Sequence, residues 1–139
     1  MVRADLAARK IARASDHLDE AEVILGRPAL ELAADRHARD AAAFYLFLAI
    51  QKSIDLAAHW IADAGWPAPD DVGSTFDVLA QQAAIPADLA DEMRALVRLR
   101  NRIAHGYASI DHDRIREESP AGIASLRSFL AAVGTAAGL

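Results

Sequence analysis

The sequence predicts an all-α fold, an up-and-down bundle of about five helices that forms one domain over residues 1–139. Apolar residues make up 53% of the chain but aromatic residues only 6%, so aliphatic side chains and alanine must supply the core. Apolar positions recur at helical spacing, and glycine and proline separate the periodic segments. A chain of 139 residues has room for one core and little more.

The first two helices account for the first half of the chain. Apolar residues repeat at helical spacing over residues 5–25, with charged residues on the opposite face. Residues 26–28 (GRP) end this helix, because glycine accepts a left-handed end and proline cannot continue the backbone hydrogen bonds. A second, much longer helix is expected to begin near Ala29 or Glu31 and to run to Ala64.

A loop and a short third helix follow. Residues 65–74 contain two prolines and two glycines and form the clearest predicted loop. Ser74 or Thr75 is expected to cap a short helix that ends near Ala84, because the residue before Pro86 is disfavoured in the helical region.

Two further helices complete the bundle. The penultimate helix is expected to start at residues 86–87, where acidic residues favour a helix amino end, and to reach roughly His105. The last helix is expected to begin at Asp113 or Pro120 and to close the bundle near Val133.

The composition limits the cellular compartment and the kinds of binding site that we expect. The absence of cysteine excludes a disulfide scaffold and a thiolate metal site. The charged amino end has no apolar segment of the length that a signal peptide needs, which favours a cytoplasmic location. Residues 41–50 (AAAFYLFLAI) cover about half of a bilayer span, so we expect a buried helical segment and no membrane association.

Positive charge is concentrated near one end of an otherwise acidic chain. The net charge of −5 disfavours an indiscriminate nucleic-acid binder. Residues 94–116 nevertheless hold six arginines against two aspartates, which gives this window a charge of +4 and the remainder a charge of −9. We therefore expect anions to be drawn to this part of the molecule.

The most informative segment is RNRIAHGY, residues 100–107, where the penultimate helix runs out. Arg100 and His105 differ by five positions, roughly 140° of rotation, so the arginine must reach around the helix for both to act together. A guanidinium stabilises charge on phosphate oxygens and an imidazole exchanges protons near neutral pH, a combination suited to RNA cleavage without metal. The alternative is structural, because both residues also stabilise a helix carboxyl end, and on spacing alone this alternative is favoured.

Other polar and aromatic positions carry weaker signals. Asp55, His59 and Asp63 share a helix face and could form a metal site, but a solvated stripe is the favoured interpretation, and we expect neither a metal nor a cofactor. Phe44, Tyr45 and Phe47 could stack on bases, but they lie in the most apolar segment and are expected in the core or in a dimer interface.

The segments LRNRIAHGYASID (residues 99–111) and RHARDAAAFYLFLAIQKSIDLAAHWIADAGWPAPDD (residues 36–71) resemble the HEPN superfamily. The resemblance is to its HepT-like branch, also called the domain of unknown function 86 family, and covers roughly residues 5–133. It implies a HEPN-like homodimer that acts as a metal-independent endoribonuclease, the toxin of a toxin-antitoxin pair. Its cleft would form where two copies of the motif helix face each other.

The resemblance also implies roles for individual residues. Arg100 would hold the scissile phosphate, His105 would act as general acid or base, and Asn101 would orient the phosphate or the imidazole. Tyr107 matches the tyrosine to which a minimal nucleotidyltransferase antitoxin adds AMP in some members. Asp40 matches an acidic position of the second helix and would have a supporting role.

The sequence departs from the family pattern at Lys52, where many members have an acidic residue, which argues against a network of carboxylates on the second helix. Because the subunit is acidic, we expect a short or structured RNA target such as part of a tRNA. Two other functions stay open: a non-catalytic module that binds a nucleotide or docks a nucleotidyltransferase partner, and a purely structural dimer.

Overall fold

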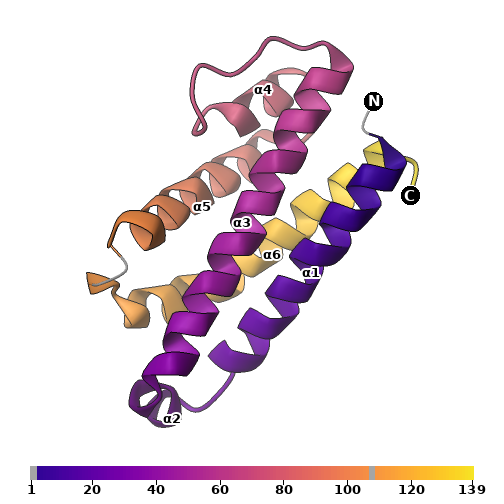
Figure 1. The fold of residues 1–139 in the computed structure, drawn as a ribbon. Helices are drawn as coiled ribbons and strands as arrows, with labels where there is room; N and C mark the ends of the chain where they lie inside the picture. The colour runs from indigo at the N-terminus through magenta and orange to yellow at the C-terminus, as the bar shows by residue number, and fades with distance from the viewer. Residues whose placement is uncertain (1–2, 107–108) are drawn as a thin grey trace.

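The computed structural model describes residues 3–106 and 109–139, which form α-helices and contain no strand. Figure 1 shows α1 and α3 running antiparallel side by side, with α5 and α6 completing the bundle and the start of α1 close to the end of α6. The all-α prediction is confirmed. The helices are α1 (Ala4–Leu25), α2 (Ala29–Ala34), α3 (Arg36–Ala64), α4 (Thr75–Gln81), α5 (Ala87–Gly106) and α6 (His112–Ala136).

Asp35 divides the long helix that the sequence predicted as one. Its backbone leaves the helical region at φ −117° and ψ 88°, and its carboxylate accepts a hydrogen bond of 3.0 Å from the backbone N–H of Ala38. The Arg27 guanidinium pairs with the same carboxylate at 3.1 Å. An aspartate that caps a new helix competes with continuation of the previous one, so the described residues form six helices instead of about five.

Two other helix boundaries differ from the predictions. α4 ends three residues before the predicted Ala84, and Ala83 has a φ of 56°, which a continuing helix cannot adopt. α6 starts before both predicted positions because the carboxylate of Asp111 accepts from the backbone N–H of Arg114 at 3.1 Å. Pro120 therefore lies inside the helix at an exposed position.

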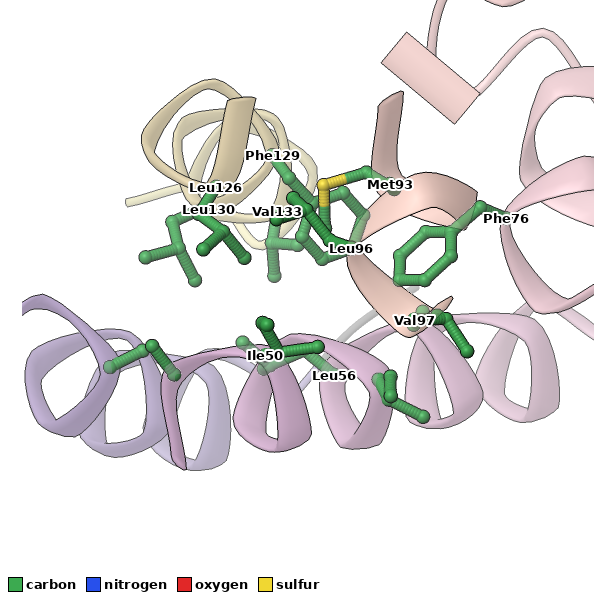
Figure 2. Packing of buried hydrophobic residues seen from close by; sticks show 14 of the residues in the cluster. Ile50, Leu56, Phe76, Met93, Leu96, Val97, Leu126, Phe129, Leu130 and Val133 are labelled. Carbon is green, nitrogen blue, oxygen red and sulfur yellow. The ribbon is translucent and has the colours of Figure 1, made fainter. Parts of the chain in front are cut away.

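The core includes buried residues of α1, α3, α4, α5 and α6, and Figure 2 shows the part where α3, α4, α5 and α6 meet. Phe76 of α4 and Phe129 of α6 are fully buried and pack edge to face, with ring centroids 5.1 Å apart and an interplanar angle of 86°. Met93 from α5 and Leu56 from α3 are equally buried in the same cluster. This core fixes α5 against α3 and α6, and so fixes the segment that carries the arginine–histidine motif.

α3 is long and apolar enough to cross a membrane if only length and composition are considered, with a mean hydropathy of 1.3 over 18 residues. Half of that window is buried inside the bundle. α3 contacts every other helix of the described residues, α1, α2, α4, α5 and α6, as expected of a core helix. Phe44, however, is 57% exposed, so of the two places expected for it, the core and a dimer interface, it does not lie in the core of the subunit.

Candidate functional site

α5 positions the motif by burying one face. Its apolar residues Leu96, Leu99 and Ile103 recur at helical spacing and are buried against the rest of the bundle. This packing leaves Arg100 and Asn101 half-buried beside α3 and leaves His105, in the last turn, exposed.

The Arg100 guanidinium is held by two amide oxygens. Its Nη1 donates to Oε1 of Gln51 on α3 at 3.0 Å, and its Nε and Nη2 donate to Oδ1 of Asn101 at 3.2 and 2.6 Å. No carboxylate among residues 3–106 and 109–139 forms an ion pair with it. Both acceptors are neutral, so the guanidinium is fixed in place and keeps its charge and further N–H groups for an anion.

His105 lies at the edge of a pocket of about 410 Å³ between the end of α5 and the start of α6. The polar residues lining this pocket include Arg102, Asp111 and Arg114. No hydrogen bond in the described part of the chain joins His105 to Arg100. One subunit therefore presents the two motif side chains on different sides of α5, as their spacing of roughly 140° requires.

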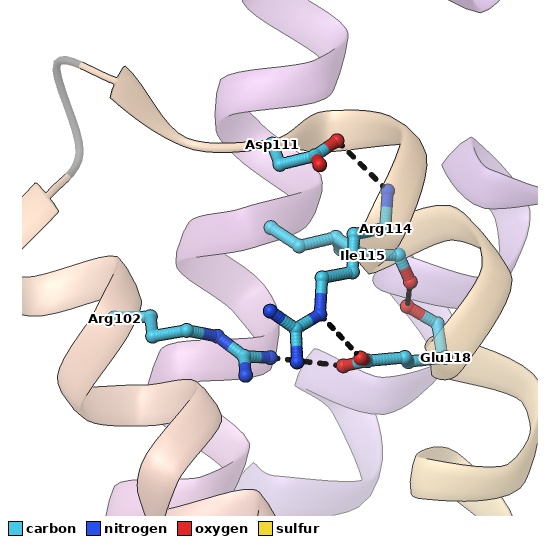
Figure 3. A network of polar contacts seen from close by, with 6 residues as sticks. Arg102, Asp111, Arg114, Ile115 and Glu118 are labelled. Atoms are coloured by element: carbon cyan, nitrogen blue, oxygen red, sulfur yellow. Dashed lines mark hydrogen bonds and ion pairs between the residues drawn. The ribbon is translucent and has the colours of Figure 1, made fainter.

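Glu118 of α6 bridges two arginines of the basic window (Figure 3). Its carboxylate accepts from Arg102 at 2.9 Å and from Arg114 at 2.7 Å. The hydrogen bond from Arg114, together with the charges of both arginines, lowers the pKa of Glu118. Arg94 likewise pairs with Asp77 at 3.2 Å, so the positive charge predicted for residues 94–116 is partly neutralised by acids outside that window.

The lowered pKa of Glu118 predicts that this bridge contributes to the acid stability of the protein. Because folding lowers the pKa of this carboxyl, its contribution to stability is present above its ordinary value of 4.5 and is lost as the pH falls through the lowered value. We expect Glu118→Gln to flatten the decrease in unfolding free energy below about pH 4.5, as urea titrations at several pH values would show. If the unfolding free energy of the variant falls with pH as it does in the wild type, solvent screens the Glu118 ion pairs too strongly for them to stabilise the protein.

Asp40 occupies a different place from Arg100. Its carboxylate lies 3.5 Å from Nε2 of His112 and 3.6 Å from Nε of Arg36, and no hydrogen bond or ion pair of the described residues joins it to Arg100 or His105. It lines a hollow of about 380 Å³ between α3 and α5, on which the exposed Phe44 also lies.

The hollow is otherwise largely apolar. The Phe44 ring is stacked nearly parallel to that of Phe47, with centroids 6.3 Å apart, and Ala43, Ile103, Ala104 and Ile110 complete the lining. The predicted modification site, Tyr107, lies outside the described residues.

The sequence matches the family model described as "Ribonuclease HepT-like" over residues 14–133. The chain belongs to the HepT-like ribonuclease family. A search of curated proteins gave no match.

Solved structures show the same HEPN fold. A tri-AMPylated Shewanella oneidensis HEPN toxin in complex with MNT antitoxin superposes with a TM-score of 0.87 at 21% identity, covering 94% of this chain and 98% of that one. A chain of a toxin-antitoxin complex with AMP-PNP gives 0.84 at 21% identity, with 93% and 98% covered. The cytosolic protein YutE of Bacillus subtilis, of unknown function, gives 0.75 at 16% identity, with 97% and 92% covered.

Within this HepT-like fold, Gln51 is the polar contact that sequence reasoning missed. In the sequence it only closes the apolar run of residues 41–50. A usable signal was its spacing of four from Asp55, because each residue of this polar pair directly follows a buried isoleucine, Ile50 or Ile54.

The stripe of Asp55, His59 and Asp63 does not assemble into a cluster. Asp55 is engaged by Gln51 and Lys10, whereas His59 and Asp63 are exposed. Among the described residues, no group of three or more His, Asp or Glu side chains is arranged to hold a metal ion.

Proposed function

We propose that this protein is a metal-independent endoribonuclease and the toxin of a toxin-antitoxin pair, acting in the cytoplasm as a single HEPN-like domain. The observation that carries the proposal is the set of contacts of the Arg100 guanidinium. Two neutral amide oxygens accept its hydrogen bonds, and no carboxylate of the described residues forms an ion pair with it. His105, exposed one turn and a half further along α5, supplies a group that can exchange protons. Membership of the HepT-like ribonuclease family supports the same activity.

The chemistry follows from these two side chains. The ribose 2′-hydroxyl attacks the neighbouring phosphorus, its oxygen forms the new P–O bond, and the bond to the 5′ oxygen of the next nucleotide breaks. His105 would take the proton from the attacking hydroxyl or give one to the leaving oxygen. Arg100 would stabilise the charge on the phosphorane oxygens. The products are a 2′,3′-cyclic phosphate and a 5′-hydroxyl.

A second copy of the chain would complete the site. Arg100 and His105 lie on different sides of one α5. If two α5 helices face each other across a two-fold axis, Arg100 of one subunit can meet His105 of the other. The apolar hollow with the exposed Phe44 lies beside the motif helix and offers a surface that such a homodimer would bury. Asn101 would fix Arg100, and Asp40 would have a supporting role at the rim of this surface.

The proposed antitoxin is a minimal nucleotidyltransferase that transfers AMP from ATP to the Tyr107 hydroxyl, with pyrophosphate as the leaving group. Adding phosphates close to the cleft would repel RNA. The tri-AMPylated HEPN toxin in complex with MNT antitoxin, which shares the fold, supports this partner.

We expect the chain expressed alone to arrest growth, and co-expression with a nucleotidyltransferase encoded beside it to relieve the arrest. Intact mass should then show one or more AMP additions, which Tyr107→Phe should abolish. Growth arrest that persists in Arg100→Ala would contradict the proposed activity. Relief without any mass addition would leave inhibition by complex formation and would contradict the role of Tyr107.

A further inference from the structure

A line of polar side chains crosses the bundle from α1 through α3 to Arg100 on α5. We propose that Gln51, oriented by Asp55 and Lys10, is a positioning residue that holds the Arg100 guanidinium toward an RNA phosphate without neutralising it. This inference rests on the proposed function, because it concerns how that site is prepared. It adds residues of α1 and α3 that are remote from the motif in sequence.

The contacts form a continuous chain. Nζ of Lys10 lies 3.8 Å from Oδ2 of Asp55, and Oδ1 of Asp55 accepts from Nε2 of Gln51 at 3.2 Å. Oε1 of Gln51 then accepts from Nη1 of Arg100 at 3.0 Å. Each member has its next partner on a neighbouring turn or helix, so the chain depends on the packing of α1, α3 and α5.

The chemistry of its two partners, Asp55 and Arg100, determines which way the Gln51 amide points. A carboxylate can only accept hydrogen bonds, and a guanidinium can only donate them. A glutamine between the two must therefore turn its NH₂ toward Asp55 and its oxygen toward Arg100. Asp55, which does not touch Arg100, thus sets the acceptor that Arg100 meets.

The same arrangement keeps negative charge away from the guanidinium. Gln51 separates the carboxylate of Asp55 from Arg100. The same carboxylate is paired with Lys10, whose side chain is only 21% exposed. Arg100 therefore meets an amide dipole, whereas Arg102 and Arg114 meet the carboxylate of Glu118. A carboxylate at position 51 would compete with a phosphate for the same N–H groups.

The decisive variant exchanges the two functional groups. Gln51→Glu combined with Asp55→Asn moves the carboxylate next to Arg100 and keeps the net charge, the side-chain lengths and a hydrogen bond between positions 51 and 55. Gln81→Glu combined with Asp63→Asn makes the same two substitutions at exposed positions and serves as the matched control.

We expect the exchange to lower kcat/KM for RNA by roughly tenfold or more, mainly through a higher KM, with a thermal midpoint within about 2 °C of the wild type. The control should match the wild type in both measurements. If the exchanged variant cleaves RNA with wild-type kcat/KM, or if the control loses as much activity, the inference is wrong.

Binding to RNA that cannot be cut separates positioning from general structure. With a 2′-O-methyl RNA, the exchange should weaken affinity roughly tenfold in the wild-type background and less than about twofold in the Arg100→Ala background. An equal loss in both backgrounds would show that Gln51 acts by some route other than Arg100.

A readout in the free protein keeps this inference distinct from the proposed function. The Nη1 group of Arg100, which donates to Gln51, should show restricted rotation about its Cζ–Nη1 bond by NMR in the wild type and faster rotation in Gln51→Leu. If wild-type protein neither binds nor cuts RNA, the proposed function fails, and this measurement still tests the positioning. Equally fast rotation of that group in both proteins would overturn it.

Discussion

Replacing His105 by alanine should lower the rate of RNA cleavage by about 10²- to 10⁴-fold, the usual contribution of a general acid or base. The loss should fall on kcat, since the Arg100 contacts with Gln51 and Asn101 do not involve His105. Because His105 is exposed at the end of α5, its removal should leave the helical content unchanged. Initial rates on a labelled RNA, together with circular dichroism, measure both quantities.

His59→Ala provides the matched control for this variant. His59 is also an exposed histidine in a helix, but it lies on α3 and the proposal gives it no role. Its activity should equal that of the wild type. Equal cleavage by the His105→Ala protein would point to a contaminating nuclease and favour the non-catalytic module.

Replacing Phe129 by alanine should lower the free energy of unfolding by about 3–5 kcal/mol, the largest stability loss that we expect from one substitution. The Phe129 ring is fully buried and packs against Phe76 in the region where α4, α5 and α6 meet. The helices around it cannot close the cavity without shifting α5. Urea denaturation measures the change.

Leu30→Ala is the comparison for an exposed apolar residue. Leu30 is 87% exposed on α2, and its truncation should change the unfolding free energy by less than about 0.5 kcal/mol. If Phe129→Ala costs as little as Leu30→Ala, the packing described for the α4–α5–α6 region is wrong.

Most helices could be predicted because their local signals agree. α1 and α5 have apolar residues at helical spacing and a glycine at the carboxyl end, and their observed ends lie within one or two residues of the predicted ones. Asp35 was missed because the apolar pattern continues on both sides of it, and the capping bond and the ion pair with Arg27 become visible only when the chain turns there. Pro120 offered a false helix start, because the capping bond to Asp111 starts α6 eight residues earlier, at His112.

The candidate site was predictable in its residue types but not in its surroundings. Arg100 and His105 could be identified from their spacing and from the family resemblance, and their roles remain proposals. The partner of Arg100 could not be predicted, because Gln51 lies 49 residues away and meets it only through the packing of α3 against α5. The local charge was overestimated for the same reason, since Glu118 reaches Arg102 from another helix.

The chemical nature of the cleaved RNA ends tests the central claim most directly. RNA incubated with purified protein in EDTA should yield fragments with 2′,3′-cyclic phosphate and 5′-hydroxyl ends, because the proposed nucleophile is the neighbouring ribose hydroxyl and no metal takes part. Fragments with 5′-phosphate and 3′-hydroxyl ends, or cleavage that requires added divalent metal, would contradict the account.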